Sequence, residues 1–168
     1  MNARLLPEPP TSGSLPEIQF YRGGPPLWVE FIDDQLEIWA GCFSSGETGR
    51  KKVLLPSIGH ACFLLATGRG YWVDTNERRI ICETECSYLE DAVLVPDTAL
   101  VLVSDFTNLE LLSSSGPVWR SKRISLDGIE FTSMSRQTIE GTVYDGSSAR
   151  QRFVFQVESR LLQCEWEC

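Results

Sequence analysis

Histidine is almost absent from this chain, which contains only His60, and no stretch of about 20 apolar residues occurs. A single histidine excludes a histidine-rich metal site. It also leaves one candidate for the general base that a serine or cysteine nucleophile commonly needs. No Gly-x-Ser-x-Gly motif accompanies His60, and the glycine-rich turns lack the Gly-Lys-Ser/Thr ending of a phosphate-binding loop. The sequence therefore predicts neither a membrane helix nor a recognisable catalytic motif.

Export signals are missing as well. Arg4 is not followed by the apolar region of about 7–15 residues that a secretory signal requires. No Asn-x-Ser/Thr acceptor for glycosylation occurs anywhere in the sequence. We therefore expect a cytoplasmic protein whose thiols are mostly reduced. A secreted chain whose signal has been removed would have the same composition and stays the alternative.

Basic residues are outnumbered, with 15 Lys and Arg against 23 Asp and Glu, and the formal net charge is −8. A negative protein repels the phosphate backbone of nucleic acids and the surface of anionic membranes. We therefore expect no nucleic-acid partner and no membrane partner. A basic protein is the partner that this charge favours.

The length of 168 residues fits one domain, which at this size buries roughly two-thirds of the surface of its unfolded chain. Residues 1–15 are rich in Pro, Ser and Gly and contain few apolar side chains. We expect a disordered or loosely attached tail there. A single domain should occupy residues 16–168.

Short apolar segments recur along that domain, separated by Gly, Asp, Asn and Ser. This pattern is typical of antiparallel strands joined by turns. Apolar stripes of helical period are missing, and only residues 86–95 have weak helical features before Pro96. We predict an all-β antiparallel meander of about 12–14 short strands, arranged as two packed sheets or as a small propeller-like closed arrangement.

The chain also repeats its own layout. Four units of about three strands begin near residues 27, 62, 99 and 129, each with a hairpin and basic residues. If the units are equivalent, the basic side chains gather on one rim and bind anions. The alternative is that they pair with neighbouring glutamates in an ordinary meander. The candidate binding residues from these clusters are Arg120, Lys122 and Arg123, together with the adjacent Trp119.

Two segments, residues 82–86 and 164–168, share the pattern Cys-Glu-x-Glu-Cys. In an extended strand, alternate side chains face the same side, so the cysteines would point to the core and the glutamates to water. Cysteine packs there as a small hydrophobe, and this is the favoured interpretation. About 13 Å separates the two cysteine Cα atoms within one such strand, too far for a disulfide or a shared zinc ion.

Pairing between the two segments is the alternative. If their strands lie antiparallel and in register, Cys82 faces Cys168 and Cys86 faces Cys164. Two such thiol pairs would suit zinc or a disulfide, so these four cysteines are the metal candidates. The other two cysteines of the chain, Cys42 and Cys62, are predicted in the core.

Acidic pairs are the remaining candidates for chemistry. They occur at Asp33 and Asp34, Glu83 and Glu85, Glu90 and Asp91, and Glu165 and Glu167. Two carboxylates that flank a sugar can hydrolyse a glycosidic bond. Adjacent acids in turns, and alternating acids on strands, are more often solvated surface.

The favoured function is therefore that of a non-catalytic binding or interaction protein that needs no cofactor. An inhibitor or immunity-type protein that covers a basic partner fits the small size and the negative charge. A zinc or thiol-redox module that uses the paired cysteines is the first alternative. A carboxylate-dependent hydrolase is the second.

Overall fold

The computed structural model describes residues 1–86 and 88–165. Within these ranges the chain forms sixteen strands and no helix, so it contains no helix long and apolar enough to cross a membrane. The strands are β1 (Asn2–Leu6), β2 (Glu17–Gln19), β3 (Pro26–Ile32), β4 (Ile38–Ser44), β5 (Lys51–Leu54), β6 (Ala61–Ala66), β7 (Arg69–Asp74), β8 (Arg79–Glu83), β9 (Asp91–Leu94), β10 (Val101–Ser104), β11 (Leu109–Ser113), β12 (Gly116–Arg120), β13 (Ile129–Met134), β14 (Thr138–Val143), β15 (Gln151–Gln156) and β16 (Leu161–Cys164).

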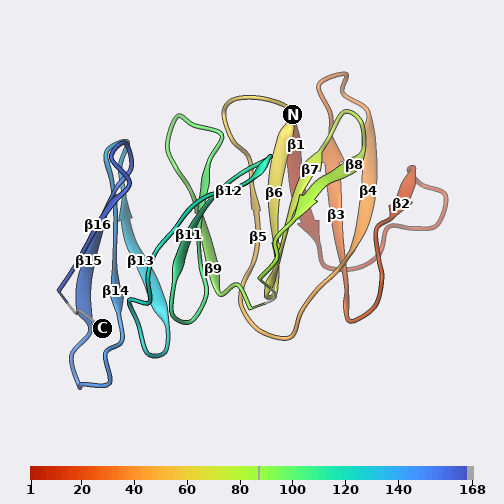
Figure 1. The fold of residues 1–168 in the computed structure, drawn as a ribbon. Helices are drawn as coiled ribbons and strands as arrows, with labels where there is room; N and C mark the ends of the chain where they lie inside the picture. The colour runs from red at the N-terminus through yellow and green to blue at the C-terminus, as the bar shows by residue number, and fades with distance from the viewer. Residues whose placement is uncertain (87, 166–168) are drawn as a thin grey trace.

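These strands form four sheets of four strands each. The first sheet has the order β1-β3-β4-β2, and the second, third and fourth sheets contain β5 to β8, β9 to β12 and β13 to β16 in chain order. Figure 1 shows the sheets in a row, from the first at the right to the fourth at the left. The expected all-β antiparallel meander is confirmed, and among the described strands only β2 pairs in parallel, with β4.

Hydrophobic cores fill the spaces between neighbouring sheets. Between the first and second sheets, Phe31 and Trp39 stack with ring centroids 4.2 Å apart. Trp72 lies in the core between the second and third sheets, and Trp119 packs on Phe155 between the third and fourth. Across residues 1–86 and 88–165 no such core joins the first sheet to the fourth, so the row is open at both ends.

Strand β1 corrects the expectation of a loose tail over residues 1–15. It pairs antiparallel with β3 along its whole length. Ala3 and Leu5 pack against the core between the first and second sheets, whereas Arg4, on the opposite face, lies 2.6 Å from Glu30. For residues 2–6 the prediction was wrong, because this alternation is short and a proline-rich segment follows it directly.

Strand β9 replaces the weak helix considered for residues 86–95. Ala92 packs into the core with the second sheet, and Val93 packs into the core with the fourth. The sequence of a strand that is buried on both faces is a continuous run of apolar residues, and a short buried helix has the same kind of sequence. The third sheet therefore starts at Asp91, one strand before the repeat unit predicted near residue 99.

The first strands of neighbouring sheets meet on one side of the row, where β1 contacts β5 and β5 contacts β9. Lys52 on β5 lies 2.5 Å from Asp91 on β9, whose side chain is 8 % exposed. The same ammonium donates to the carbonyl of Ala92 at 3.1 Å. This ion pair between Lys52 and Asp91 connects the second sheet to the third. The other edges of these two sheets, β8 and β12, border a cleft.

Candidate functional site

A narrow cleft lies between the outer edges of the second and third sheets. Strands β7 and β8 and the segment after β8 form one wall, and β11 and β12 form the other. Its described lining includes three glutamates and no lysine or arginine. The lining residues are Trp72, Cys82, Glu83, Thr84, Glu85, Glu110, Leu112, Ser113, Gly116 and Pro117.

The floor of the cleft is apolar. Trp72 on β7 and Leu112 on β11 are buried and belong to the core between the second and third sheets. Cys82 pairs with Trp72 in the β7–β8 register and packs on the same core. The indole Nε1 of Trp72 is buried and has no hydrogen-bond acceptor among the residues that the structure describes. An unsatisfied buried donor costs about 1–3 kcal/mol, which a ligand that supplies an acceptor would recover.

The rim of the cleft is acidic. Glu83 ends β8 and is exposed like Glu85, whereas Glu110 on β11 is half-buried. Burial raises the pKa of Glu110; Arg120 offsets part of this effect, and Glu85 adds to it. A carboxylate that is costly to ionise in isolation gains most from a cation placed beside it.

The cleft therefore suits a cation carried on an apolar stem. A lysine or arginine side chain can lay its methylene groups along the floor of the cleft and keep its charge among the glutamates. The face of an indole ring also attracts cations. Cys82 is a poor nucleophile here, because burial raises the pKa of its thiol. These groups favour binding over bond cleavage.

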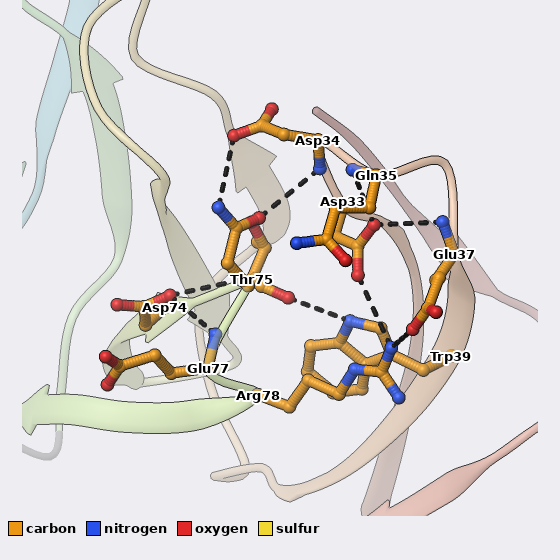
Figure 2. Close-up of polar contacts among 10 residues, drawn as sticks. Asp33, Asp34, Gln35, Glu37, Trp39, Asp74, Thr75, Glu77 and Arg78 are labelled. Carbon is orange, nitrogen blue, oxygen red and sulfur yellow. Dashed lines mark hydrogen bonds and ion pairs between the residues drawn. The ribbon is translucent and has the colours of Figure 1, made fainter.

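A separate polar cluster lies where the β3–β4 and β7–β8 turns meet, at the ends of the first two sheets (Figure 2). Asp33 is 3 % exposed and accepts the backbone N–H of Gln35 at 3.0 Å and of Glu37 at 2.9 Å. Its second oxygen lies 3.4 Å from Arg78, which also pairs with Glu37. The pair between Asp33 and Arg78 joins the first sheet to the second. Because the oxygens of Asp33 already bind the protein's own groups, they have little capacity to bind a ligand.

His60 lies beside this cluster. Its Nδ1 contacts an oxygen of Asp34 that also accepts from Asn76 at 3.2 Å. The other oxygen of Asp34 lies 3.1 Å from the amine of Met1. The pKa of Asp34 is lowered, first by the bond from this amine and then by those from Asn76 and His60. Within residues 1–86 and 88–165, no serine or cysteine side chain bonds to the imidazole, so His60 has no nucleophile to activate.

The described parts of the two Cys-Glu-x-Glu-Cys segments, residues 82–86 and 164–165, do not pair with each other. Cys82 lies on β8 of the second sheet and Cys164 on β16 of the fourth, with the third sheet between them. The predicted facing of Cys86 and Cys164 is wrong, because each meander pairs only strands that are close in the chain. Cys168 lies outside the described residues, so its facing with Cys82 is not described. No group of three or more His, Cys, Asp or Glu side chains arranged for a metal occurs in the part of the chain that the structure describes.

Burial governs the chemistry of the cysteines. Cys42 and Cys62 are core residues, and burial raises the pKa of the Cys62 thiol to about 12. Burial also raises the pKa of Cys42, Cys82 and Cys86. Cys86 and Cys164 pack against separate cores. A thiol that resists ionisation is a poor metal ligand and a slow redox group, so packing best explains the positions of Cys42, Cys62, Cys82 and Cys86.

The basic clusters occupy different positions in their sheets. Arg50 precedes the first strand of the second sheet, Arg79 begins its last strand, and Arg152 lies on the third strand of the fourth sheet. They therefore do not form one rim. Their acidic partners are Asp91 for Arg50 and Lys52, Asp33 and Glu37 for Arg78, Glu77 for Arg79, Asp105 for Arg120, Glu130 for Arg150, and Glu140 for Arg152.

The four candidate binding residues at the end of the third sheet face different surroundings. The ring of Trp119 lies 4.7 Å from that of Phe155, in the core between the third and fourth sheets. Arg120 pairs with Asp105 at 3.4 Å. Arg123 donates to the carbonyl of Ser125 at 3.0 Å, and Lys122 is exposed. The structure does not bring these side chains together into one site.

Sequence reasoning singled out Glu83 and Glu85 as an acidic pair but missed Trp72, Leu112 and Glu110 as their neighbours. The missing information is which sheet stacks on which, and that depends on contacts between distant segments. One local signal was available: Glu110 interrupts an otherwise apolar strand, which is unusual for a strand in the middle of a row.

Neither the protein-family models nor the curated proteins compared with this chain match it. What the protein does must therefore be inferred from its own residues.

Proposed function

We propose that the protein is a non-catalytic binding protein whose cleft between the second and third sheets accepts a lysine or arginine side chain of a basic partner protein. One observation carries the proposal: Glu83, Glu85 and Glu110 border an apolar floor that contains Trp72 and Leu112. An inhibitor or immunity-type protein that covers a basic toxin or enzyme is a binder of this kind. A cytoplasmic location belongs to the same proposal.

The three glutamates have different parts in such binding. Glu83 and Glu85 are exposed, so they add to the negative field of a chain with a net charge of −8 and speed the approach of a basic protein. Glu110 is half-buried beside the floor, so it contacts the cation after the ligand has displaced water from the cleft.

Binding of single side chains tests the site directly. We would titrate the protein with the N-acetyl amides of arginine, lysine and norleucine and follow the indole N–H resonances by NMR, with Trp72→Phe to assign the signal of Trp72. The two cations should shift the Trp72 resonance, and the uncharged norleucine derivative should shift it far less. Equal shifts from all three compounds, or no shift from any, would contradict a cation site.

Replacing Glu110 separates binding from stability. Burial raises the pKa of Glu110, so the folded protein loses stability as pH rises from the pKa of an ordinary glutamate, about 4.3, through that raised value. Glu110→Gln should therefore leave the protein equally or slightly more stable at pH 7 while it weakens binding of the arginine derivative. Glu140→Gln on the fourth sheet is the matched control and should leave binding unchanged.

The pH dependence of binding has the same origin. As pH falls through the raised pKa of Glu110, the wild-type protein should lose affinity for the arginine derivative, whereas Glu110→Gln should not show this step. Calorimetric titration across the acidic range measures both. A wild-type profile that matches the variant's would remove Glu110 from the site.

A further inference from the structure

The first sheet has an outer face that no core of the described residues covers. Alternate residues of β3 pack inward, so Trp28, Glu30 and Ile32 face outward. On β4, the residues that pair with them are Cys42, Ala40 and Ile38. Leu6 on β1 pairs with Trp28 and extends this surface. The outer face is thus largely apolar, with one row of charge across it.

The outer face of the fourth sheet, at the other end of the row, is polar. Glu140 on β14 lies 2.7 Å from Arg152 on β15, and Glu130 on β13 lies 3.5 Å from Arg150. Both glutamates and Arg152 face away from the core that Ile139 and Phe153 enter. Leu161 also lies on this face, but among charged and amide side chains, so of the described residues those of the first sheet form the more apolar outer face.

The apolar side chains of this outer face can meet those of a second copy under a twofold rotation. Large side chains on β3 stand beside small ones on β4, since Trp28 pairs with Cys42 and Glu30 pairs with Ala40. A twofold axis that runs along the strands between β3 and β4 places β3 of one copy over β4 of another. Each Trp28 then lies over the Cys42 position of the second copy and each Ile32 over Ile38, so the apolar side chains of the two faces meet.

The charges on this face are complementary under the same rotation. Arg4 on β1 and Glu17 on β2 lie at opposite edges of one row that crosses the sheet through Glu30 and Ala40. The twofold axis exchanges the two edges, so each Arg4 meets Glu17 of the second copy. The side chain of Arg4 is 70 % exposed, while that of its own partner Glu30 is 15 % exposed. Arg4 can therefore bridge both carboxylates.

We infer that the protein forms a twofold dimer in which the outer faces of the two first sheets stack on each other. This contact is isologous, and the polar fourth sheets at both far ends stop further growth. Four strands about 4.8 Å apart, with seven residues in β3 and β4, give a face roughly 15–20 Å wide in each direction. Such a contact lies at the small end of specific interfaces, so the dimer should dissociate on dilution. The inference does not depend on the proposed cleft.

Sedimentation of the full chain over a range of concentrations tests this dimer. The wild-type protein should pass from monomer to dimer and no further. Ile38→Glu places a charge in the contact and should raise the dimer dissociation constant about tenfold or more. Ile38 is 47 % exposed in the single chain, so the variant should fold normally. Leu161→Glu is the matched control, because Leu161 is 53 % exposed on the outer face of the fourth sheet and should leave the dimer intact.

A second variant tests the charges. Glu17→Arg places an arginine opposite Arg4 of the second copy at both edges of the contact. This repulsion should weaken the dimer, most strongly at low salt. Gln163→Arg on β16 is its control and should not. A wild-type protein that stays monomeric at the highest attainable concentration overturns the inference, even if another protein covers this face. Assemblies larger than a dimer, or an Ile38→Glu variant that dimerises like the wild type, overturn it as well.

Discussion

The β3–β4 turn of the first sheet and the β13–β14 turn of the fourth are built alike. Asp33 accepts two backbone N–H groups of its turn at 3.0 and 2.9 Å, and Ser135 accepts two of its own at 3.2 and 2.9 Å. Each turn also takes part in an ion pair with the neighbouring sheet. The side chains of Asp33 and Arg78 are 4 % and 24 % exposed, whereas those of Asp97 and Arg136 are 55 % and 78 % exposed.

Burial is thus what distinguishes two turns that share their local chemistry. At the first sheet, water is excluded from the bonds that hold the turn, and their loss leaves polar groups without a solvent partner. At the fourth sheet, water can replace each bond that is broken. We therefore expect matched substitutions to have unequal effects at the two ends of the row.

The largest difference should come from removing the two capping oxygens. Asp33→Ala leaves two backbone donors unpaired and the half-buried Arg78 with one acidic partner fewer, so we expect a loss of about 3 kcal/mol in the free energy of unfolding. Ser135→Ala should lose about 1 kcal/mol or less. Urea denaturation measures both. Asp33→Asn keeps an acceptor without the charge and should fall between them; equal losses at the two turns would contradict the role of burial.

The two turns also show what the sequence can predict. Adjacent acids such as Asp33 and Asp34 could be expected in a turn from the sequence alone, because the hydrogen bonds of such a turn are local and strand alternation marks the segments on either side. Arg78 follows Asp33 by 45 residues, and no local pattern connects them. The same limit applies to the cleft: Glu83 and Trp72 could be recognised singly, but their meeting with Glu110 depends on how the second and third sheets stack.

Strand β1 shows a second limit. Its inward residues Ala3 and Leu5 bury little area by themselves, and their pattern is shorter than the window that periodicity needs. Only the pairing with β3 makes the segment a strand. The sequence also did not indicate that the row of sheets would be open at both ends. Whether sheets close on each other depends on what their outer faces meet.

A difference of intermediate size between the two ends of the row should appear in stability when the pH and the salt concentration are varied. The pKa of Asp34 at the first sheet is lowered chiefly by its bond from the charged Met1 amine, and that of Asp145 at the fourth by its bonds with Ser147. A lowered pKa stabilises the fold above the unfolded value of about 3.9, and this contribution is lost as pH falls through the folded value. Asp34→Asn and Asp145→Asn should each lower stability near pH 7 and match the wild type at low pH.

Salt should separate these two aspartates. Added salt screens the pair between Asp34 and the Met1 amine and so should shrink the effect of Asp34→Asn, whereas the neutral hydroxyl and amide partners of Asp145 are not screened. Thermal unfolding at low and high ionic strength measures the difference. An Asp34→Asn effect that is independent of salt would show that the charged amine contributes little.

The smallest effect should come from the exposed ion pair of the fourth sheet. Arg136→Ala removes the contact with Asp97, but both side chains are more than half exposed, and water solvates Asp97 when the arginine is gone. We expect no resolvable change in the thermal midpoint at any salt concentration. If Arg136→Ala instead lowers the midpoint as far as Asp33→Ala does, then the ion pair itself, and not its burial, holds each turn against the neighbouring sheet.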